Sequence, residues 1–597
     1  MNRFTSGRST PSIARLSVAA ALASLLIPGT CARGADITWT GALNNQWGFT
    51  SGFPLNLTNW SPFTSTPGSG SDVLFDDTGM NNIIQLGGNR SIRSIEFAGT
   101  NGYTLSGSGN TLTLGSGDLT ASGALGVILT TSVDVQASAE WDIGDGATVT
   151  INGGLDESGA TPYVLTKSGA GTLQLSNNRL AGTIVTGGTL RFVSDFALGE
   201  TGADIQMSDG TTLATSSFAG SITADAGRRL ILESGEIVFE TGKRDTTVAW
   251  DGTLQGAGAL TKQGMGALRL RGTAANTNSG LTTVAEGTLQ LEKTPGVTAV
   301  GGDLLVDGGT LIFAADDQLN DSAVVTLESG EIDFGATSQS FHTLAVGSSE
   351  SLGLSAGSQL NLDVVDASSG GTFTIGGGST LSVDLVLGTL RNSPNGTLAP
   401  GDSAGTTHIT GKYQNNGTLA IELGGLSPGT EHDQVIVDGT VVLSAASALD
   451  VTLIDGFVPS PGDEFNLLDF ASRLGVFGTV NLPSLDGGMT WDQSRLNSEG
   501  ELLVLSSLPG DYNNDGLVDA ADYTVWRDNL GAPAGALRND FAGGAIGAPQ
   551  YDAWAANFGA TLPLPSLAVP EPSVVAALTA FVVSMAAGVR QRRANAD

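Results

Sequence analysis

One short segment near the C-terminus has the residue types and spacing of a calcium loop. Oxygen-bearing side chains stand at positions 1, 3, 5, 9 and 12 of twelve residues: Asp511, Asn513, Asp515, Asp519 and Asp522. Gly516 at position 6 allows a sharp turn, and Leu517 at position 7 can offer its main-chain carbonyl. Calcium prefers such hard oxygen ligands. An Asp/Asn-rich turn rarely combines five spaced donors with this glycine, so the sequence predicts one calcium site.

Two short helices are expected beside this loop. Apolar residues at helical spacing follow it: Tyr523, Trp526 and Leu530. They share one helix face, and Gly531 ends the helix. The pattern returns twenty-eight residues later: Tyr551, Trp554, Phe558 and Gly559. The spacing therefore predicts a duplicated loop–helix module.

The second loop departs from the calcium pattern. The five positions that match the side-chain ligands hold Asn539, Phe541, Gly543, Gly547 and Gln550. Phe541 and the two glycines supply no side-chain oxygen. We expect a metal-free loop kept for packing, in which Gly544 and Ile546 preserve the turn and the inward apolar residue.

This module, residues 508–560, resembles the dockerin type I repeat, which also carries Asp rather than Glu at position 12. The resemblance implies calcium affinity in the extracellular range, about 10⁻⁴ to 10⁻³ M or somewhat tighter, and a cohesin-like partner. Loss of the second site puts symmetric, two-faced docking in doubt. We favour the simpler role of a calcium-stabilised spacer.

From residue 35 to about 507 the chain is built from short alternating segments. Apolar and polar residues alternate within each segment, and Gly, Asn, Asp or Ser ends it. Period-two alternation predicts half-buried strands joined by turns, and no stretch here keeps a 3.6-residue period. The expected fold class of this region is all-β.

Internal repeats point to a solenoid. Residues 165–190 and 260–289 share the pattern LTKxGxG, then a loop, then GTL, with four extra loop residues in the second copy. Residues 232–237 recur at 327–332, also 95 positions later. Insertions confined to loops suit stacked coils, because each coil contacts only its neighbours.

The repeated pattern resembles the autotransporter-associated β-strand repeat over roughly residues 36–410. The resemblance implies a right-handed parallel β-helix, here 35–397, followed by β coils and a cap at 398–507. Trp39, Trp47 and Trp60 are expected to cover the first coil. Carbohydrate stacking is the alternative role for these tryptophans.

The N-terminus has the pattern of a secretory signal covering residues 1–34. Three arginines precede the apolar run 16–27, and the small residues Ala32 and Gly34 suit cleavage after position 34. The single cysteine, Cys31, lies inside this segment. The mature chain is therefore expected to contain no disulfide.

The C-terminus has the features of a second targeting signal. After a linker, 561–573, with Pro570-Glu571-Pro572, the tail 574–597 has a sixteen-residue apolar run and three arginines. The run is slightly short for a spanning helix, and the arginines favour the cytoplasmic side. The arrangement resembles a PEP-CTERM sorting signal, which implies processing by an exosortase-type enzyme. A plain membrane anchor is the alternative.

The net charge of the chain and two motifs that resemble catalytic sites limit the functions to be considered. A net charge of −33 argues against nucleic acid as a partner. The string Gly401–Gly405 matches G-x-S-x-G, but β-repeats follow it where a helix would be needed, and the sequence has only three histidines. The pairs Asp76–Asp77 and Asp316–Asp317 imitate glycosidase carboxylates but lack basic neighbours, so turns are expected there.

The sequence favours a non-enzymatic, exported cell-surface protein for adhesion or for matrix and envelope structure. Its expected partners are the sorting enzyme, extracellular polysaccharide or a cohesin-like protein, and the membrane through the tail. Two alternatives stay open. One is an enzyme acting on polysaccharide along the solenoid, and the other is a cohesin-docked subunit of a surface assembly.

Overall fold

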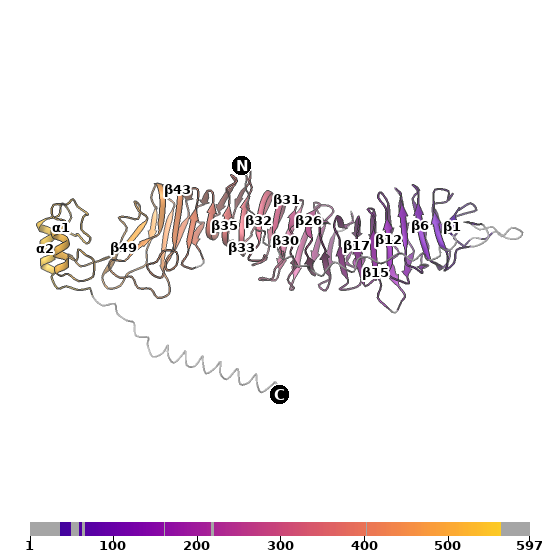
Figure 1. Cartoon of the computed structure of the whole chain (residues 1–597), viewed down its shortest axis with the longest axis horizontal. Coiled ribbons are helices and arrows are strands. Elements are labelled where there is room, and N and C mark those ends of the chain that lie inside the picture. The colour runs from indigo at the N-terminus through magenta and orange to yellow at the C-terminus, as the bar shows by residue number, and fades with distance from the viewer. Residues whose placement is uncertain are drawn as a thin grey trace, which may run out of the picture. The chain divides into compact units, whose positions relative to one another are not determined.

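The computed structural model describes residues 36–48, 50, 59–62, 66–123, 125–159, 161–216, 220–401 and 403–562. The predicted signal peptide and sorting tail lie outside these residues. The described chain is mostly β, a solenoid of about 16 turns with two short helices, α1 (Ala520–Asp528) and α2 (Ala548–Asn557) (Figure 1). The chain divides into two compact units.

The first unit contains residues up to Arg191 together with Phe196–Glu200. Its first parallel ladder runs in the order β1 (Asp36–Trp39), β3 (Asp72–Phe75), β6 (Ser94–Ala98), β9 (Leu119–Ser122), β12 (Ala139–Ile143), β15 (Val164–Ser168) and β17 (Gly182–Val185). The second is β4 (Ile83–Gln85), β7 (Tyr103–Ser106), β10 (Gly126–Leu129), β13 (Thr148–Ile151) and β16 (Thr172–Leu175). The third is β5 (Arg90–Ile92), β8 (Thr111–Leu114), β11 (Ser132–Val135) and β14 (Leu155–Glu157). The four coils from β3 to β14 thus each give one strand to each ladder.

Period-two alternation builds these coils. In β16 the leucines at 173 and 175 are fully buried while their neighbours are half-exposed. Val73 pairs with Ile95 and Ile95 with Leu119, so apolar residues stack on apolar residues from coil to coil. The interior is therefore a continuous apolar column, as the sequence pattern predicts.

A tryptophan cluster closes the start of the first unit. The strand β2 (Trp60–Ser61) pairs antiparallel with β1. The rings of Trp39, Trp47 and Trp60 have no exposed surface, and Trp60 lies 4.9 Å from Trp39 and 4.5 Å from Trp47 between centroids. The alternative role in carbohydrate stacking is wrong for these three residues, because a sugar ring cannot reach a fully buried indole.

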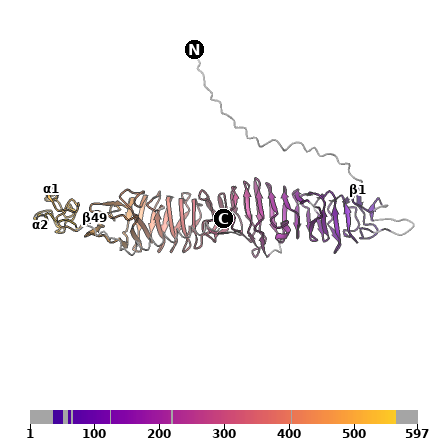
Figure 2. The ribbon, with the colours of Figure 1, turned by 90° about the horizontal axis from the view of Figure 1, so that it is seen from below.

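The second unit contains Phe192–Asp195 and the chain from Thr201 on. Its longest parallel ladder is formed by β20 (Thr211–Thr215), β23 (Glu236–Glu240), β26 (Ala259–Gln263), β29 (Thr282–Val284), β31 (Leu304–Phe313), β32 (Val324–Asp333), β33 (Ser338–Val346), β35 (Gln359–Asp366), β37 (Thr380–Leu387), β40 (Thr406–Ile409), β43 (Gln434–Leu443) and β46 (Leu468–Leu474). A neighbouring parallel ladder contains β24 (Thr247–Trp250), β27 (Ala267–Gly272) and β30 (Thr288–Lys293). Figure 2 shows the same stacked strands from a second side.

Long strands turn corners of the second unit. The ten-residue β31 pairs with β29 through its first half and with β30 through its second half. The parallel ladders of both units confirm the predicted β-solenoid. Its right-handedness, which rests on the family resemblance, stays a prediction.

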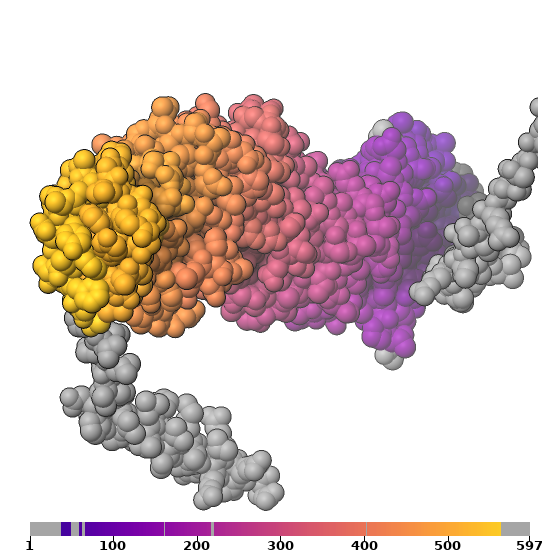
Figure 3. All heavy atoms as spheres, turned by 60° about the vertical axis from the view of Figure 1, so that its left-hand side comes forward, coloured from indigo at the N-terminus to yellow at the C-terminus, as the bar shows by residue number. Residues whose placement is uncertain are grey.

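After the last coil the pairing changes from parallel to antiparallel. β45 (Glu464–Asn466), β49 (Glu501–Ser506) and β48 (Met489–Asp492) form a three-stranded sheet in that order, named here the cap sheet. The loop–helix module follows at residues 508–562, and Figure 3 shows its yellow surface against the orange residues of the last strands. No helix of the described ranges is long and apolar enough to cross a membrane.

Candidate metal centre

The two halves of the module contact each other through reciprocal hydrogen bonds. Trp526 in α1 donates its indole N–H to the carbonyl of Gly547, just before α2, at 2.9 Å. Trp554 in α2 donates to the carbonyl of Asp519, just before α1, at 2.7 Å. Tyr512, Leu537 and Ile546 form a small shared core. Each helix start is thus fixed by the other half, which places the first loop on a rigid support.

The first loop closes around its acidic side chains. Asp511, which is fully buried, accepts N–H bonds from Asp515 at 3.1 Å and Gly516 at 2.9 Å. Asp522, also fully buried, accepts from the main chain of Asn513 at 2.9 Å and of Asp519 at 2.8 Å. Gly516 has a φ of 82°, the left-handed turn predicted for position 6. These hydrogen bonds from main-chain N–H groups to the two carboxylates fix the shape of the loop.

The remaining predicted ligands lie toward the outside of the loop. Asp515 accepts the Leu517 N–H at 3.0 Å and the Asn513 side-chain amide at 2.7 Å. Asp519 caps α1 by accepting the Ala521 N–H at 2.7 Å. Across the described ranges, no three Asp, Glu, His or Cys side chains already converge as a metal cage. Coordination by all six predicted residues therefore requires side-chain rotations.

The charges of the loop suit a cation. Burial raises the pKa of Asp511, and the negative charge of Asp522 raises it further, although hydrogen bonds from Ser506, Gly516 and Asp515 act the other way. A divalent ion relieves the repulsion between buried carboxylates. The all-oxygen donor set fits calcium better than a softer metal.

The second loop is closed by a side-chain amide. Gln550 stands where the first loop has Asp522, and its side-chain oxygen accepts the Gly547 N–H at 2.8 Å. Its amide nitrogen donates to both carboxylate oxygens of Asp540 at 3.2 Å and to the carbonyl of Gly543 at 2.9 Å. Inside this loop, the fully buried amide of Gln550 thus donates hydrogen bonds where the first loop would hold a cation.

We expect Gln550→Ala to destabilise the module by about 1–2 kcal/mol, because Asp540 and the Gly543 carbonyl lose their buried donor. The loss should be equal in calcium and in chelator. Thermal unfolding followed by tryptophan fluorescence measures it, with the exposed Asp552→Ala on the same helix as control. A loss seen only in calcium would contradict a metal-free second loop.

An asparagine that the sequence pattern did not single out joins the first loop to the cap sheet. Asn514 is 1 % exposed and has a φ of 57°. Its side chain accepts the Ser506 N–H at 2.6 Å and donates to the Val504 carbonyl at 2.6 Å, at the end of β49. Asn539 of the second loop donates to the Asn514 side chain at 2.9 Å. Asn occurs at left-handed turns, but its partners became visible only in the fold.

Buried lysines explain the repeated LTK motif. Lys167 and Lys262 have no exposed surface. The Lys167 Nζ donates to the carbonyls of Ser168, Gly169 and Gly187 at 2.7–2.9 Å. The Lys262 Nζ donates to the carbonyls of Gln263, Gly264 and Glu286 at 2.7–2.9 Å. Each lysine ties its own turn to the next coil.

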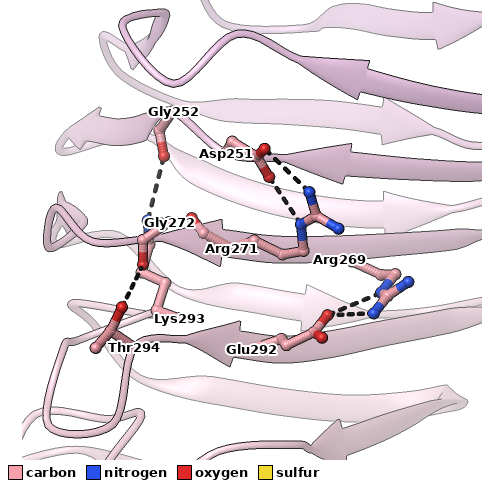
Figure 4. Close-up of polar contacts among 8 residues, drawn as sticks. All are labelled: Asp251, Gly252, Arg269, Arg271, Gly272, Glu292, Lys293 and Thr294. Atoms are coloured by element: carbon pink, nitrogen blue, oxygen red, sulfur yellow. Dashed lines mark hydrogen bonds and ion pairs between the residues drawn. The ribbon is translucent and has the colours of Figure 1, made fainter.

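Lys293 makes a related contact at the end of β30. Its Nζ donates to the carbonyls of Gly252 at 3.2 Å and Arg271 at 2.8 Å, in the two preceding coils. Figure 4 shows this side chain beside the outward Arg271–Asp251 and Arg269–Glu292 ion pairs. Burial lowers the pKa of all three lysines to about 8, so each is still an ammonium with three donors at neutral pH.

The catalytic lookalikes are turns. Ser403 has a φ of 66°, and the strand β40 follows it where a nucleophile elbow needs a helix. Asp77 accepts N–H bonds from Thr100 and Asn101, which lower its pKa, and Asp316 accepts the Ser338 N–H. These carboxylates therefore hold backbone turns.

One open cleft on the solenoid has an acidic lining. It has a volume of about 720 Å³, and its carboxylates are Asp321, Asp363 and Asp384. The Nδ1 atom of His342 donates to a carboxylate oxygen of Asp363 at 2.6 Å. Among the described lining residues there is no Lys, Arg, Tyr or Trp. Its described aromatic residue, Phe341, is 2 % exposed, so the described lining offers neither a basic partner nor an exposed aromatic ring to a polysaccharide.

Comparisons with known proteins agree with the repeat analysis. Residues 165–192 and 260–291 match the family model described as Passenger-associated-transport-repeat, and each match contains a buried motif lysine. The adhesin BmaC autotransporter of Brucella suis biovar 1 (strain 1330) is 27 % identical over 448 residues, which cover 68 % of this chain and 11 % of that protein. The chain thus spans about a tenth of the length of this curated relative. Two segments of the chain are thus similar to passenger-associated-transport repeats, and the chain is distantly similar to an autotransporter adhesin.

Proposed function

We propose that this protein is a non-enzymatic adhesion or matrix protein of the cell surface. The observation that carries the proposal is the repeat solenoid, together with its similarity to an autotransporter adhesin. A stacked solenoid offers a long, rigid surface for contacts with polymers or neighbouring cells. The engagement of the candidate catalytic carboxylates in backbone turns favours this function over polysaccharide cleavage.

Adhesion is tested with cells that display the full chain and cells that lack it. Saturable attachment to polysaccharide-coated surfaces, lost with the protein, is the expected result. Release of reducing sugar ends by the purified chain, without attachment, would favour the enzyme alternative.

The metal centre has a supporting role in this proposal. Calcium would be held by the side chains of Asp511, Asn513, Asp515, Asp519 and Asp522 and the carbonyl of Leu517. The bound ion neutralises the buried acidic pair and fixes the loop that carries Asn514. Because Asn514 bonds to the end of β49, calcium would stiffen the junction between module and cap sheet.

A second candidate function is docking of a cohesin-like protein. The observation that favours it is an exposed apolar surface on the two helices: Tyr523 36 %, Tyr551 39 %, Phe558 57 % and Leu530 59 % exposed. Soluble proteins often use such surfaces for partner binding. A pull-down with a purified cohesin domain tests it, and binding that survives Tyr523→Ala with Tyr551→Ala would exclude this surface.

Attachment through the C-terminus completes the proposal. Residues 563–597 lie outside the described residues, so their role rests on the Pro570-Glu571-Pro572 motif and the apolar run after it. Deleting residues 569–597 should release most of the protein into the medium, as measured by immunoblots of cells and medium. Replacing Arg592 and Arg593 alone by Gln serves as a milder variant. Unchanged cell association of the deletion would contradict anchoring by the tail.

A further inference from the structure

A cleft of about 610 Å³ lies between the cap sheet and the second loop of the module. Its floor is one face of β48 and β49, where Thr490 pairs with Leu505 and Asp492 with Leu503. Paired residues of an antiparallel sheet point to the same side. On the opposite face of the sheet, the rings of Trp491 and Phe465 lie 5.8 Å apart, and His432 packs on Phe465 at 5.5 Å between centroids. The cleft therefore has a supported floor that combines polar and apolar side chains.

The wall of the cleft comes from the loop that lacks calcium ligands. Asn539 is 5 % exposed, and its amide nitrogen already donates to Asp511 and Asn514 at 2.9 Å. Its side-chain oxygen has no hydrogen-bond partner among the described residues. A buried acceptor without a donor is uncommon and calls for a ligand or water that can donate. Phe541, next but one along the chain, is 60 % exposed.

The charges that line the cleft are balanced. Arg495 is held by Glu499 at 2.5 Å and Glu501 at 2.9 Å, and Arg538 pairs with Glu464. Asp492 and Asp540 supply acceptors in the same lining. A charged ligand would meet an already paired partner, so the lining favours a neutral molecule that donates and accepts many hydrogen bonds.

We propose that this cleft binds a short neutral carbohydrate. Vicinal hydroxyls can donate to Asp492 and Asp540, and they can accept from the guanidinium N–H groups of Arg495 and Arg538. The exposed Phe541 ring offers an apolar face for a pyranose ring. The loop positions that lost calcium ligands thus have a binding role. The inference gives the proposed adhesion a ligand class and a site, and rests on the proposed function in that respect.

The test is isothermal titration calorimetry of the purified full chain in the presence of calcium. The probes are maltotetraose, cellotetraose and chitotriose, each up to about 10 mM. At least one probe should bind. Phe541→Ala should weaken that binding about tenfold or more, and Thr490→Trp, which fills the cleft from its exposed floor, should abolish it. Phe196→Ala, which removes another largely exposed ring outside the cleft, should leave it unchanged.

Two results would overturn the proposal. One is that the unmodified chain binds none of the probes. The other is that the Phe541→Ala and Thr490→Trp variants bind a probe as tightly as the unmodified chain does. Melting temperatures within the range of the Phe196→Ala control show that the variants fold. Cell attachment that persists with Thr490→Trp would reject this cleft and leave the adhesive function standing, which separates the two failures.

Discussion

Lys262→Met should lower the free energy of unfolding of the second unit by about 2–3 kcal/mol. Three main-chain carbonyls, at 263, 264 and 286, lose their ammonium donor, and buried polar groups without partners cost about 1–3 kcal/mol each. Because some of these carbonyls keep other bonds, such as that from the Thr241 N–H to Gln263, the full sum is not expected. The effect should still exceed that of any surface lysine.

Urea unfolding followed by circular dichroism measures this change. The matched control is Lys412→Met, the same substitution at an exposed lysine of the same unit. Control and wild type should agree within about 0.5 kcal/mol. Equal midpoints for the Lys262 and Lys412 variants would show that the carbonyl contacts contribute nothing to stability.

Saturating calcium should stabilise the module, and Asp515→Ala should remove this response. Calcium at about 100 times its dissociation constant adds about 2.7 kcal/mol to the folded state. Asp515 faces outward and makes only loop-internal bonds. Its loss should therefore change stability in chelator far less than in calcium.

Thermal unfolding in calcium and in chelator measures both quantities. Asp528→Ala removes a carboxylate of α1 that pairs with Arg527 at the surface, and it should keep the full calcium response. A calcium response of normal size in Asp515→Ala would remove this residue from the metal centre. Equal melting of the unmodified chain with and without calcium would reject the site.

The solenoid was predictable because its signal is local. Alternation in segments such as Thr172–Leu175 fixes which residues point inward, and the glycines mark the turns. The Gly516 turn and the inward Ile546 followed from spacing in the same way, and both are observed. The handedness of the solenoid depends on the direction in which successive coils connect in space, and a local sequence pattern does not specify that direction.

The lysine contacts were not predictable from spacing. Lys167 lies at an inward position of β15, where a pattern-based analysis expects an apolar residue. Its role depends on the carbonyls of the next coil, which are brought close only by the register of the ladder. The repeated motif drew attention to this lysine but gave no physical reason for it.

Asn514 and Gln550 show the same limit at the candidate site. Position 4 of a calcium loop carries no side-chain ligand, so nothing in the motif singled out Asn514 as the contact with β49. The pattern indicated a lost ligand at Gln550, whereas its amide occupies the loop as an internal donor. Both roles come from tertiary neighbours that a linear pattern does not contain.

Calcium binding to the full chain, counted by isothermal titration, tests the metal centre most directly. One site per chain, with a dissociation constant near 10⁻⁴ M in order of magnitude, is the predicted result, and Gln550→Ala should leave the count at one. Two equal sites per chain, or no heat of binding up to about 10 mM calcium, would contradict the assignment of one calcium loop and one loop closed by its own side chains.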